Sequence, residues 1–243
     1  MNGDAALGMV GRCALVTGAG GAIGAAVTSR LLAAGARVHG CDRAACPPPA
    51  GAEHLSCDLR DPDAIRAAFA AARTAGVRFD TFVHCAGITR DGVLWKLDPA
   101  AWEEVIAVNL TSAFHLLAAL APDLRASGGG AVVLIASING ERGKFGQANY
   151  AASKAGLIGL AKSAAREFGR SGVRVNVVSP GWIETPMTAD LPADVRSVAL
   201  AECALPRLGT PDDVAGVVHF LCSSLSAHVT GQVLRVDGGQ CTA

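Results

Sequence analysis

The feature that most constrains the fold is a glycine-rich turn between an apolar run and a helical pattern. Residues 13–17 form the apolar run, and residues 18–24 read Gly-Ala-Gly-Gly-Ala-Ile-Gly. Helically spaced apolar residues follow at Val27, Leu31 and Leu32. A strand, a glycine turn and a helix in this order present backbone N–H groups and a helix N-terminus to a pyrophosphate. The pattern predicts a dinucleotide site at Gly18, Gly20, Gly21, Ile23 and Gly24, and the alternative is an ordinary strand-to-helix turn.

A second apolar run, residues 36–41, ends at Asp42 and Arg43. A carboxylate at the end of this strand accepts hydrogen bonds from both hydroxyls of an adenosine ribose and repels a 2′-phosphate. Asp42 therefore favours NAD(H). Arg43 is placed to pair with a 2′-phosphate, which leaves NADP(H) possible, and Asp42 is alternatively a simple polar strand terminus.

The remaining chain alternates between strand-like and helix-like segments. Strands are expected at 54–58, 79–87, 131–136, 174–178 and 232–236, and helices after Asp61-Pro62 and Asp98-Pro99 and over 150–168 and 211–221. Three prolines at 47–49 predict a loop where a helix would otherwise join two strands. This alternation predicts an α/β fold with a single doubly wound parallel sheet of the Rossmann type, flanked by helices on both faces. We expect one domain over 1–243, with ligands at the carboxyl ends of the strands.

Composition excludes several classes of function. The 243 residues are 51% hydrophobic, and 21 basic residues balance 21 acidic ones, so nothing favours nucleic acid or an anionic membrane as a partner. The eight cysteines show no metal-ligand spacing and lie largely in apolar runs, which predicts no metal site and a reducing, cytoplasmic location. We find no signal peptide and expect no apolar segment long enough to span a bilayer.

Tyr150, the only tyrosine, lies four residues before Lys154 in a run of small residues with helical character. Positions i and i+4 share one face of a helix. Ser137 lies thirteen residues upstream of Tyr150, so a hydroxyl, a phenol and an ammonium converge in a candidate proton-transfer site. The alternative is that Tyr150 and Lys154 are surface residues at a common spacing.

Asn109 lies inside the helix expected after Asp98-Pro99. Asparagine is a poor helix former because its short amide competes with the helical backbone for hydrogen bonds. From spacing alone, Asn109 is either an exposed residue or a residue that holds a water.

Together these residues resemble the short-chain dehydrogenase/reductase family over roughly residues 8–240. The resemblance rests on Thr17-Gly18…Gly24, Asp58, Ala86-Gly87, Asn109, Ser137, Tyr150-x-x-x-Lys154, Pro180-Gly181, Thr185 and 237–239 (Asp-Gly-Gly). Within the family, residues 87–91 (Gly-Ile-Thr-Arg-Asp), 146–156 and 183–187 are most similar to 3-oxoacyl thioester reductases. They are also similar to NAD-preferring type-8 17β-hydroxysteroid dehydrogenases.

The resemblance implies roles for these residues. Tyr150 would be the general acid in reduction and the base in oxidation, and Lys154 would favour its phenolate and hold the nicotinamide ribose. Ser137 would orient the substrate oxygen, and Asn109 would hold a water linked to Lys154. The other implied cofactor contacts are Asp58, Leu59, Ala86, Gly87, Pro180, Gly181, Ile183 and Thr185. A homotetramer would form through the small-residue face Ala151, Ala152, Gly156 and Gly159.

The sequence departs from the family pattern at several positions. Ala22 replaces a glycine of the cofactor turn, where its β-carbon would crowd a pyrophosphate. His84 and Cys85 replace two asparagines, one of which normally braces the sheet. The basic positions that carrier-protein reductases use for docking fall at Ala131 and Ser171, although Arg170 is adjacent. Residues 182–205, with Met187, Leu191, Val195 and Val198, would form a lid over an apolar substrate.

The predicted function is hydride transfer between a nicotinamide cofactor, NAD(H) by preference, and a ketone or secondary alcohol. The expected substrate is a 3-oxoacyl or 3-hydroxyacyl thioester or a related small ketone. One alternative is an NADPH-dependent 3-oxoacyl-acyl-carrier-protein reductase of fatty-acid or polyketide synthesis. An alternative of another class is a catalytically idle dinucleotide-binding partner subunit, against which the intact Asn109, Ser137, Tyr150 and Lys154 argue.

Overall fold

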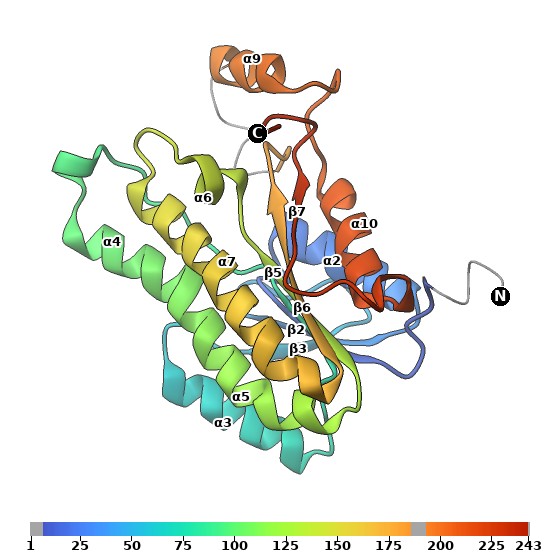
Figure 1. The fold of residues 1–243 in the computed structure, drawn as a ribbon. Coiled ribbons are helices and arrows are strands. Elements are labelled where there is room, and N and C mark those ends of the chain that lie inside the picture. Colours follow the sequence, from blue (N-terminus) through green and yellow to red (C-terminus); the bar gives the residue numbers. More distant parts are fainter. Residues whose placement is uncertain (1–6, 186–192, 243) are drawn as a thin grey trace.

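The computed structural model describes residues 7–185 and 193–242 and contains one parallel seven-stranded sheet (Figure 1). The strand order is β3-β2-β1-β4-β5-β6-β7. The strands are β1 (Cys13–Thr17), β2 (Arg37–Asp42), β3 (Glu53–Ser56), β4 (Thr81–His84), β5 (Gly130–Ile135), β6 (Val173–Pro180) and β7 (Val233–Val236). The order reverses between β1 and β4, which is where a doubly wound sheet opens a crevice for ligands. The predicted fold class is confirmed.

Helices cover both faces of the sheet (Figure 1). The helices α2 (Ala22–Ala33) and α10 (Pro211–Cys222) pack against each other on one face. The other face carries α3 (Pro62–Thr74), α4 (Pro99–Ile106), α5 (Ser112–Ala126) and α7 (Ala148–Phe168). The short α6 (Ile138–Arg142) and α9 (Ala193–Glu202) lie beyond the carboxyl ends of the central strands.

Local sequence signals explain where several elements begin and end. Asp61 caps α3 by accepting hydrogen bonds from the backbone N–H groups of Asp63 and Ala64, and Asp98 caps α4 from Ala100 N–H. No helix joins β2 to β3, as the prolines at 47–49 predict. The strand expected over 79–87 is shorter, because its pairing with β1 ends at Thr17 and His84, where the chain of β1 turns at Gly18.

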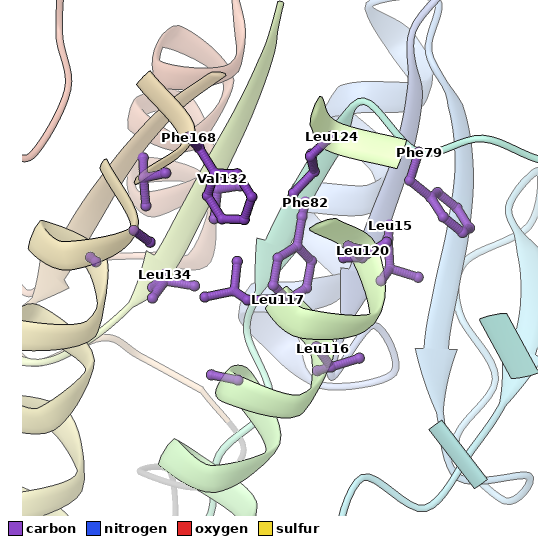
Figure 2. Close-up of a cluster of buried hydrophobic side chains, with 14 of the residues drawn as sticks. Leu15, Phe79, Phe82, Leu116, Leu117, Leu120, Leu124, Val132, Leu134 and Phe168 are labelled. Carbon is purple, nitrogen blue, oxygen red and sulfur yellow. The ribbon is translucent and has the colours of Figure 1, made fainter. Parts of the chain in front are cut away.

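The larger core lies between the sheet and the helices α3, α5 and α7. Figure 2 shows Phe82, Val132 and Leu134 of the sheet meeting the leucines of α5 and Phe168 of α7. Leu116, Leu120, Leu124, Phe82 and Val132 have no exposed surface. Burying a side chain of this size contributes about 1.5–3 kcal/mol, so this layer holds the sheet and helices in a fixed relation.

Among the described residues, one helical run, Pro99–Ala126, is long and apolar enough to cross a membrane, with a mean hydropathy of 1.7. The expectation that no segment meets these criteria is therefore wrong. The run joins α4 to α5 through a π-helical turn, Ala107–Thr111, which makes it longer than either helix. Its apolar face packs into the core through Val105, Leu116 and Leu120, which accounts for its hydropathy inside the fold.

Candidate active site

A cleft of about 620 Å³ opens at the carboxyl ends of the central strands. Most of the predicted site residues contribute to its wall. The lining includes Gly18, Gly20, Gly21, Ile23, Gly24, Gly87, Ser137, Tyr150, Lys154, Pro180, Gly181, Ile183 and Thr185. The fold therefore brings together residues that are up to 167 positions apart in the sequence, counted from Gly18 to Thr185.

The glycine turn forms one end of the cleft and needs glycine for steric reasons. Gly18 has a φ of +63°, which favours glycine, and a β-carbon on it would lie 2.8 Å from the backbone of Ala86. A β-carbon on Gly24 would lie 2.0 Å from the carbonyl oxygen of Gly18. The turn thus packs against the end of β4 and leads into α2, whose N-terminus faces the cleft. This cradle fits the pyrophosphate of a dinucleotide.

Ser137 and Tyr150 meet at the opposite end of the cleft. Ser137 follows β5 and caps α6, where its Oγ accepts a hydrogen bond from Asn139 N–H at 3.2 Å. Its hydroxyl also hydrogen-bonds the phenol of Tyr150 on α7. The helix α6 packs closely against α7 at Gly140. This residue must lack a β-carbon, because one would lie 2.8 Å from the backbone of Lys154 and Ala155.

Lys154 lies one turn after Tyr150 and is 3% exposed. Its Nζ donates a hydrogen bond to the carbonyl oxygen of Ile135 at 2.8 Å and lies 5.6 Å from the centroid of the Tyr150 ring. Burial lowers the pKa of Lys154 to about 8, because the fold removes water from the ammonium. The side chain therefore titrates close to neutral pH.

The pKa of Tyr150 differs from the expectation that its neighbouring ammonium would favour the phenolate. Burial raises this pKa, while the hydrogen bond with Ser137 opposes the rise. The Nζ of Lys154 is directed at Ile135 rather than at the phenol oxygen. In this state of the protein Tyr150 is therefore a protonated donor, the form that ketone reduction needs.

Asn109 is fully buried, so the interpretation of it as an exposed residue is wrong. It lies in the π-helical turn Ala107–Thr111 between α4 and α5. Its side-chain amide accepts from Ile88 N–H at 2.8 Å and donates to Ile88 O at 3.0 Å and to Ser153 Oγ at 3.0 Å. The amide thus connects the chain after β4 to α7, directly before Lys154.

His84 supplies the brace that the sequence analysis expected this position to lose. Its Nδ1 lies 2.9 Å from Thr17 Oγ1, and its Nε2 lies 3.4 Å from the carbonyl oxygen of Asn109. A carbonyl only accepts, so the proton is on Nε2 and Thr17 donates to Nδ1. Burial and the nearby Lys154 lower the pKa of His84 to about 3, which keeps the imidazole neutral. Burial likewise raises the pKa of the Cys85 thiol to about 12.

Six predicted residues lie outside the cleft wall. Asp42 ends β2, and its carboxylate accepts from Gly20 N–H at 3.2 Å and from Arg43 N–H at 2.8 Å. Asp58 is held by the Arg60 guanidinium at 2.6 Å, which lowers the pKa of Asp58. The others are Arg43, which is exposed, Leu59 and Ala86, which are buried in the hydrophobic core, and Asn109.

Several polar residues of the cleft were not among the residues predicted from the sequence. Asn139, Gln147 and Asp91 form a chain in which Asn139 Nδ2 donates to Gln147 Oε1 at 3.1 Å and Gln147 Nε2 donates to Asp91 Oδ2 at 2.9 Å. Gln147 and Asp91 lie in segments that carried the family resemblance, so a signal was present. Gln240 also lines the cleft, directly after the Asp-Gly-Gly motif at 237–239 that contributed to the resemblance.

The predicted lid is described only in part. Met187 and Leu191 lie outside the described residues, whereas Val195 and Val198 lie on α9 and are 37% and 60% exposed. The end of α9 is fixed to the rest of the cleft, because Glu202 accepts from Arg142 at 3.0 Å and from Gln240 at 3.3 Å.

Comparison with known proteins agrees with this geometry. Residues 18–240 match a family model described as enoyl-(acyl carrier protein) reductase. The chain is 42% identical to a (3R)-3-hydroxyacyl-CoA dehydrogenase of Rattus norvegicus over 245 aligned residues, covering 93% of this chain and 95% of the relative. It is 40% identical to a 3-oxoacyl-[acyl-carrier-protein] reductase of Escherichia coli, covering 94% and 97%.

Among solved structures, a 3-oxoacyl-[acyl-carrier protein] reductase of Brucella melitensis has a TM-score of 0.88 at 33% identity, covering 96% of this chain and 92% of that one. The match extends over the sheet, both helical layers and the cleft. The chain therefore belongs to the short-chain dehydrogenase/reductase family of oxidoreductases.

Proposed function

We propose that the protein transfers a hydride between NAD(H) and a 3-oxoacyl or 3-hydroxyacyl thioester. The observation that carries the proposal is the Ser137–Tyr150 hydrogen bond in a cleft that the glycine turn and Lys154 also line. The names of relatives that act on 3-hydroxyacyl-CoA and 3-oxoacyl carrier-protein substrates support the substrate class.

In reduction, the substrate carbonyl would accept hydrogen bonds from Ser137 and Tyr150. The bound nicotinamide supplies the hydride, and the protein positions and polarises the carbonyl. Tyr150, protonated in the structure, then gives its phenolic proton to the oxygen that becomes the alcohol. Oxidation reverses the proton transfer, with Tyr150 as the base. Lys154 and a water held by Asn109 would connect the phenol to solvent, from which the phenol regains its proton.

The residues around the glycine turn support NAD(H) as the preferred cofactor. The carboxylate of Asp42 faces the turn at Gly20, where it would accept from ribose hydroxyls and repel a 2′-phosphate. Arg43 is exposed next to it, and its charge contributes to lowering the pKa of Asp58. Use of NADPH, as in the alternative carrier-protein reductase, would require Arg43 to outweigh Asp42.

The residues at the two carrier-docking positions, Ala131 and Ser171, are a weaker argument against a carrier-protein substrate than the sequence alone suggests. Ala131 is 2% exposed within β5, so its methyl group does not reach a partner protein. Ser171 is half-buried, and the adjacent Arg170 is exposed. Thioesters of CoA and of a carrier protein are therefore both substrates for testing.

A homotetramer is part of the proposal, with the helix α7 at an interface. A β-carbon on Gly159 would meet no atom within 4 Å, so this part of α7 is open to a second copy. Gly156 differs, because its Cα faces Leu110 of the same chain. Light scattering that finds a monomer would contradict this assembly. A cytoplasmic location accords with eight free cysteines.

The test is a matrix of substrates and cofactors. Acetoacetyl-CoA, a longer 3-oxoacyl-CoA, the corresponding carrier-protein thioesters and a free ketone are each assayed with NADH and NADPH. We expect a thioester with NADH to give the highest kcat/KM and the Tyr150→Phe variant to lower the turnover by about 10³-fold. No turnover in any combination, with NADH bound, would instead support a catalytically idle subunit.

A further inference from the structure

Two cysteines meet beneath α3 at the end of the sheet that would hold the adenosine. Cys41 is the next-to-last residue of β2, and Cys57 directly follows β3. In the parallel register Cys41 is paired with Leu55, and Cys57 N–H donates to Asp42 O at 3.1 Å. Both side chains belong to the same buried hydrophobic cluster. The two thiols hydrogen-bond each other.

This contact makes Cys57 the reactive member of the pair. The hydrogen bond from Cys41 lowers the pKa of Cys57, whereas it and burial raise the pKa of Cys41. Burial raises the pKa of Cys13 to about 11 and that of Cys222 to about 12. Because the thiolate is the nucleophile, Cys57 is favoured over Cys13 and Cys222. It is also 6% exposed, while Cys41 has no exposed surface.

Each cysteine immediately precedes a carboxylate that we assign to the adenosine site. Asp42 follows Cys41, and Asp58 follows Cys57. A disulfide needs a sulfur–sulfur distance of about 2.05 Å and β-carbons about 3.5–4.5 Å apart. Two thiols that only hydrogen-bond each other keep their sulfurs farther apart than this covalent length. Closing the bond therefore pulls the ends of β2 and β3 together and moves both carboxylates.

We propose that Cys41 and Cys57 are an oxidation site for a hydroperoxide, and that their disulfide weakens the binding of NAD(H). The effect on affinity rests on the proposed function, because it assumes that Asp42 and Asp58 face the adenosine. The bond formation itself does not depend on that assumption.

The chemistry has two balanced steps. The Cys57 thiol attacks the distal oxygen of ROOH, the O–O bond breaks, and Cys57 sulfenic acid and ROH form. The sulfur of Cys41 then attacks the sulfenic sulfur, the S–O bond breaks, and water leaves with the Cys41 proton. Overall the two thiols are oxidised by two electrons and the hydroperoxide is reduced to an alcohol and water.

The experiment treats the purified full-length enzyme with hydrogen peroxide, blocks free thiols and maps tryptic peptides. Cleavage after Arg37, Arg43 and Arg60 separates residues 38–43 from residues 44–60. The second peptide also contains Cys46, so the mapping is done in a Cys46→Ala background as well. We expect the two peptides to be joined in both proteins, with the bond broken by dithiothreitol.

NADH affinity is measured by fluorescence titration before and after oxidation. We expect the dissociation constant to rise at least about fivefold on oxidation, and to recover with dithiothreitol. Cys41→Ala and Cys57→Ala should each abolish the change, and Cys13→Ala, which removes a cysteine from the neighbouring β1, should retain it. Tyr150→Phe should respond like the wild type, because its phenol lies at the other end of the cleft.

Three results would overturn the inference. One is the absence of the 38–43 to 44–60 cross-link at a peroxide concentration that oxidises Cys46. Another is a cross-link that disappears in Cys46→Ala. The third is a Cys41–Cys57 disulfide that leaves NADH affinity unchanged. Failure of the reduced enzyme to bind NADH would instead contradict the proposed function, with the cross-link still open to observation.

Discussion

The two ends of the candidate site are built in different ways. At the catalytic end, Ser137, Lys154 and Asn109 are nearly or fully buried; Lys154 and Asn109 are hydrogen-bonded to other elements, whereas Ser137 caps α6. At the proposed adenosine end, outside the cleft wall, Asp42 accepts from the glycine turn and Asp58 pairs with Arg60 two residues away, and both side chains are partly exposed. The geometry of the buried end is therefore fixed by the fold, whereas the cofactor choice that we propose for the exposed end depends on a few side chains.

The largest expected effect is at the catalytic end. Replacing Tyr150 by phenylalanine removes the proton donor while keeping the ring, so kcat should fall about 10³-fold. Steady-state kinetics measures this loss, and an NADH titration serves as the control, with affinity expected to stay within about twofold. Retained turnover would show that another group transfers the proton.

A substitution at the adenosine end should change the preference between NADH and NADPH rather than the catalytic rate. Asp42→Ala removes charged hydrogen-bond acceptors and the repulsion of a 2′-phosphate, so the preference for NADH over NADPH should fall about 10–100-fold. Dissociation constants for both cofactors measure the change, and Arg43→Ala is the matched control at the adjacent position. If Asp42→Ala leaves the ratio unchanged, Asp42 does not select the cofactor.

The pH profile tests the electrostatics of Lys154. Its pKa is lowered to about 8, so the ammonium is present below that pH and is lost above it. We expect kcat for ketone reduction to decline by about tenfold for each pH unit above the pKa, if the charged form is required. A profile that stays flat to pH 10 would mean that the ammonium is not needed.

The sequence predicts the features that depend on local patterns, and it does not predict those that depend on tertiary contacts and burial. The doubly wound parallel sheet, the helix caps at Asp61 and Asp98 and the convergence of Ser137 with Tyr150 follow from local patterns combined with the family spacing. The burial of Asn109 could not be predicted, because it depends on a π-helical turn that joins two helices. The pKa of Tyr150 could not be predicted either, because it depends on how much water the fold removes.

His84 makes a tertiary contact that could not be predicted from the sequence, because the family pattern has an asparagine at this position. The loss of an asparagine suggested a lost brace, yet the imidazole reaches both Thr17 and Asn109. The two ring nitrogens lie on different sides of the imidazole, so one side chain contacts both partners. Whether residue 84 braces the sheet therefore depends on the partners that its side chain reaches in the fold, which the residue type alone does not predict.

The imidazole should make the protein sensitive to acid. The folded pKa of His84 is about 3, below the value of about 6.5 for an unfolded chain, so the unfolded state binds more protons between these values. Stability is therefore present above pH 6.5 and lost as the pH falls toward 3. Urea unfolding at pH 7 and pH 4.5 should show a loss roughly 2 kcal/mol greater for wild type than for His84→Asn. Equal losses would place the acid sensitivity elsewhere.

The smallest expected effect concerns the glycine turn. Ala22 begins α2 and lines the cleft, where its β-carbon faces the expected position of the pyrophosphate. Ala22→Gly should tighten NADH binding about two- to threefold if this methyl group crowds the cofactor. Unchanged or weaker binding in the variant would show that the methyl group does not crowd the cofactor.

The central claim is that the cleft transfers a hydride to the 3-keto group of an acyl thioester. Its most direct test is to incubate the enzyme with acetoacetyl-CoA and NADH that carries deuterium at the transferable C4 position, and to analyse the product by mass spectrometry. The expected result is one deuterium at C3 of 3-hydroxybutyryl-CoA, formed about 10³ times more slowly by Tyr150→Phe than by the wild type. Absence of deuterium from C3, or equal labelling by both proteins, would contradict it.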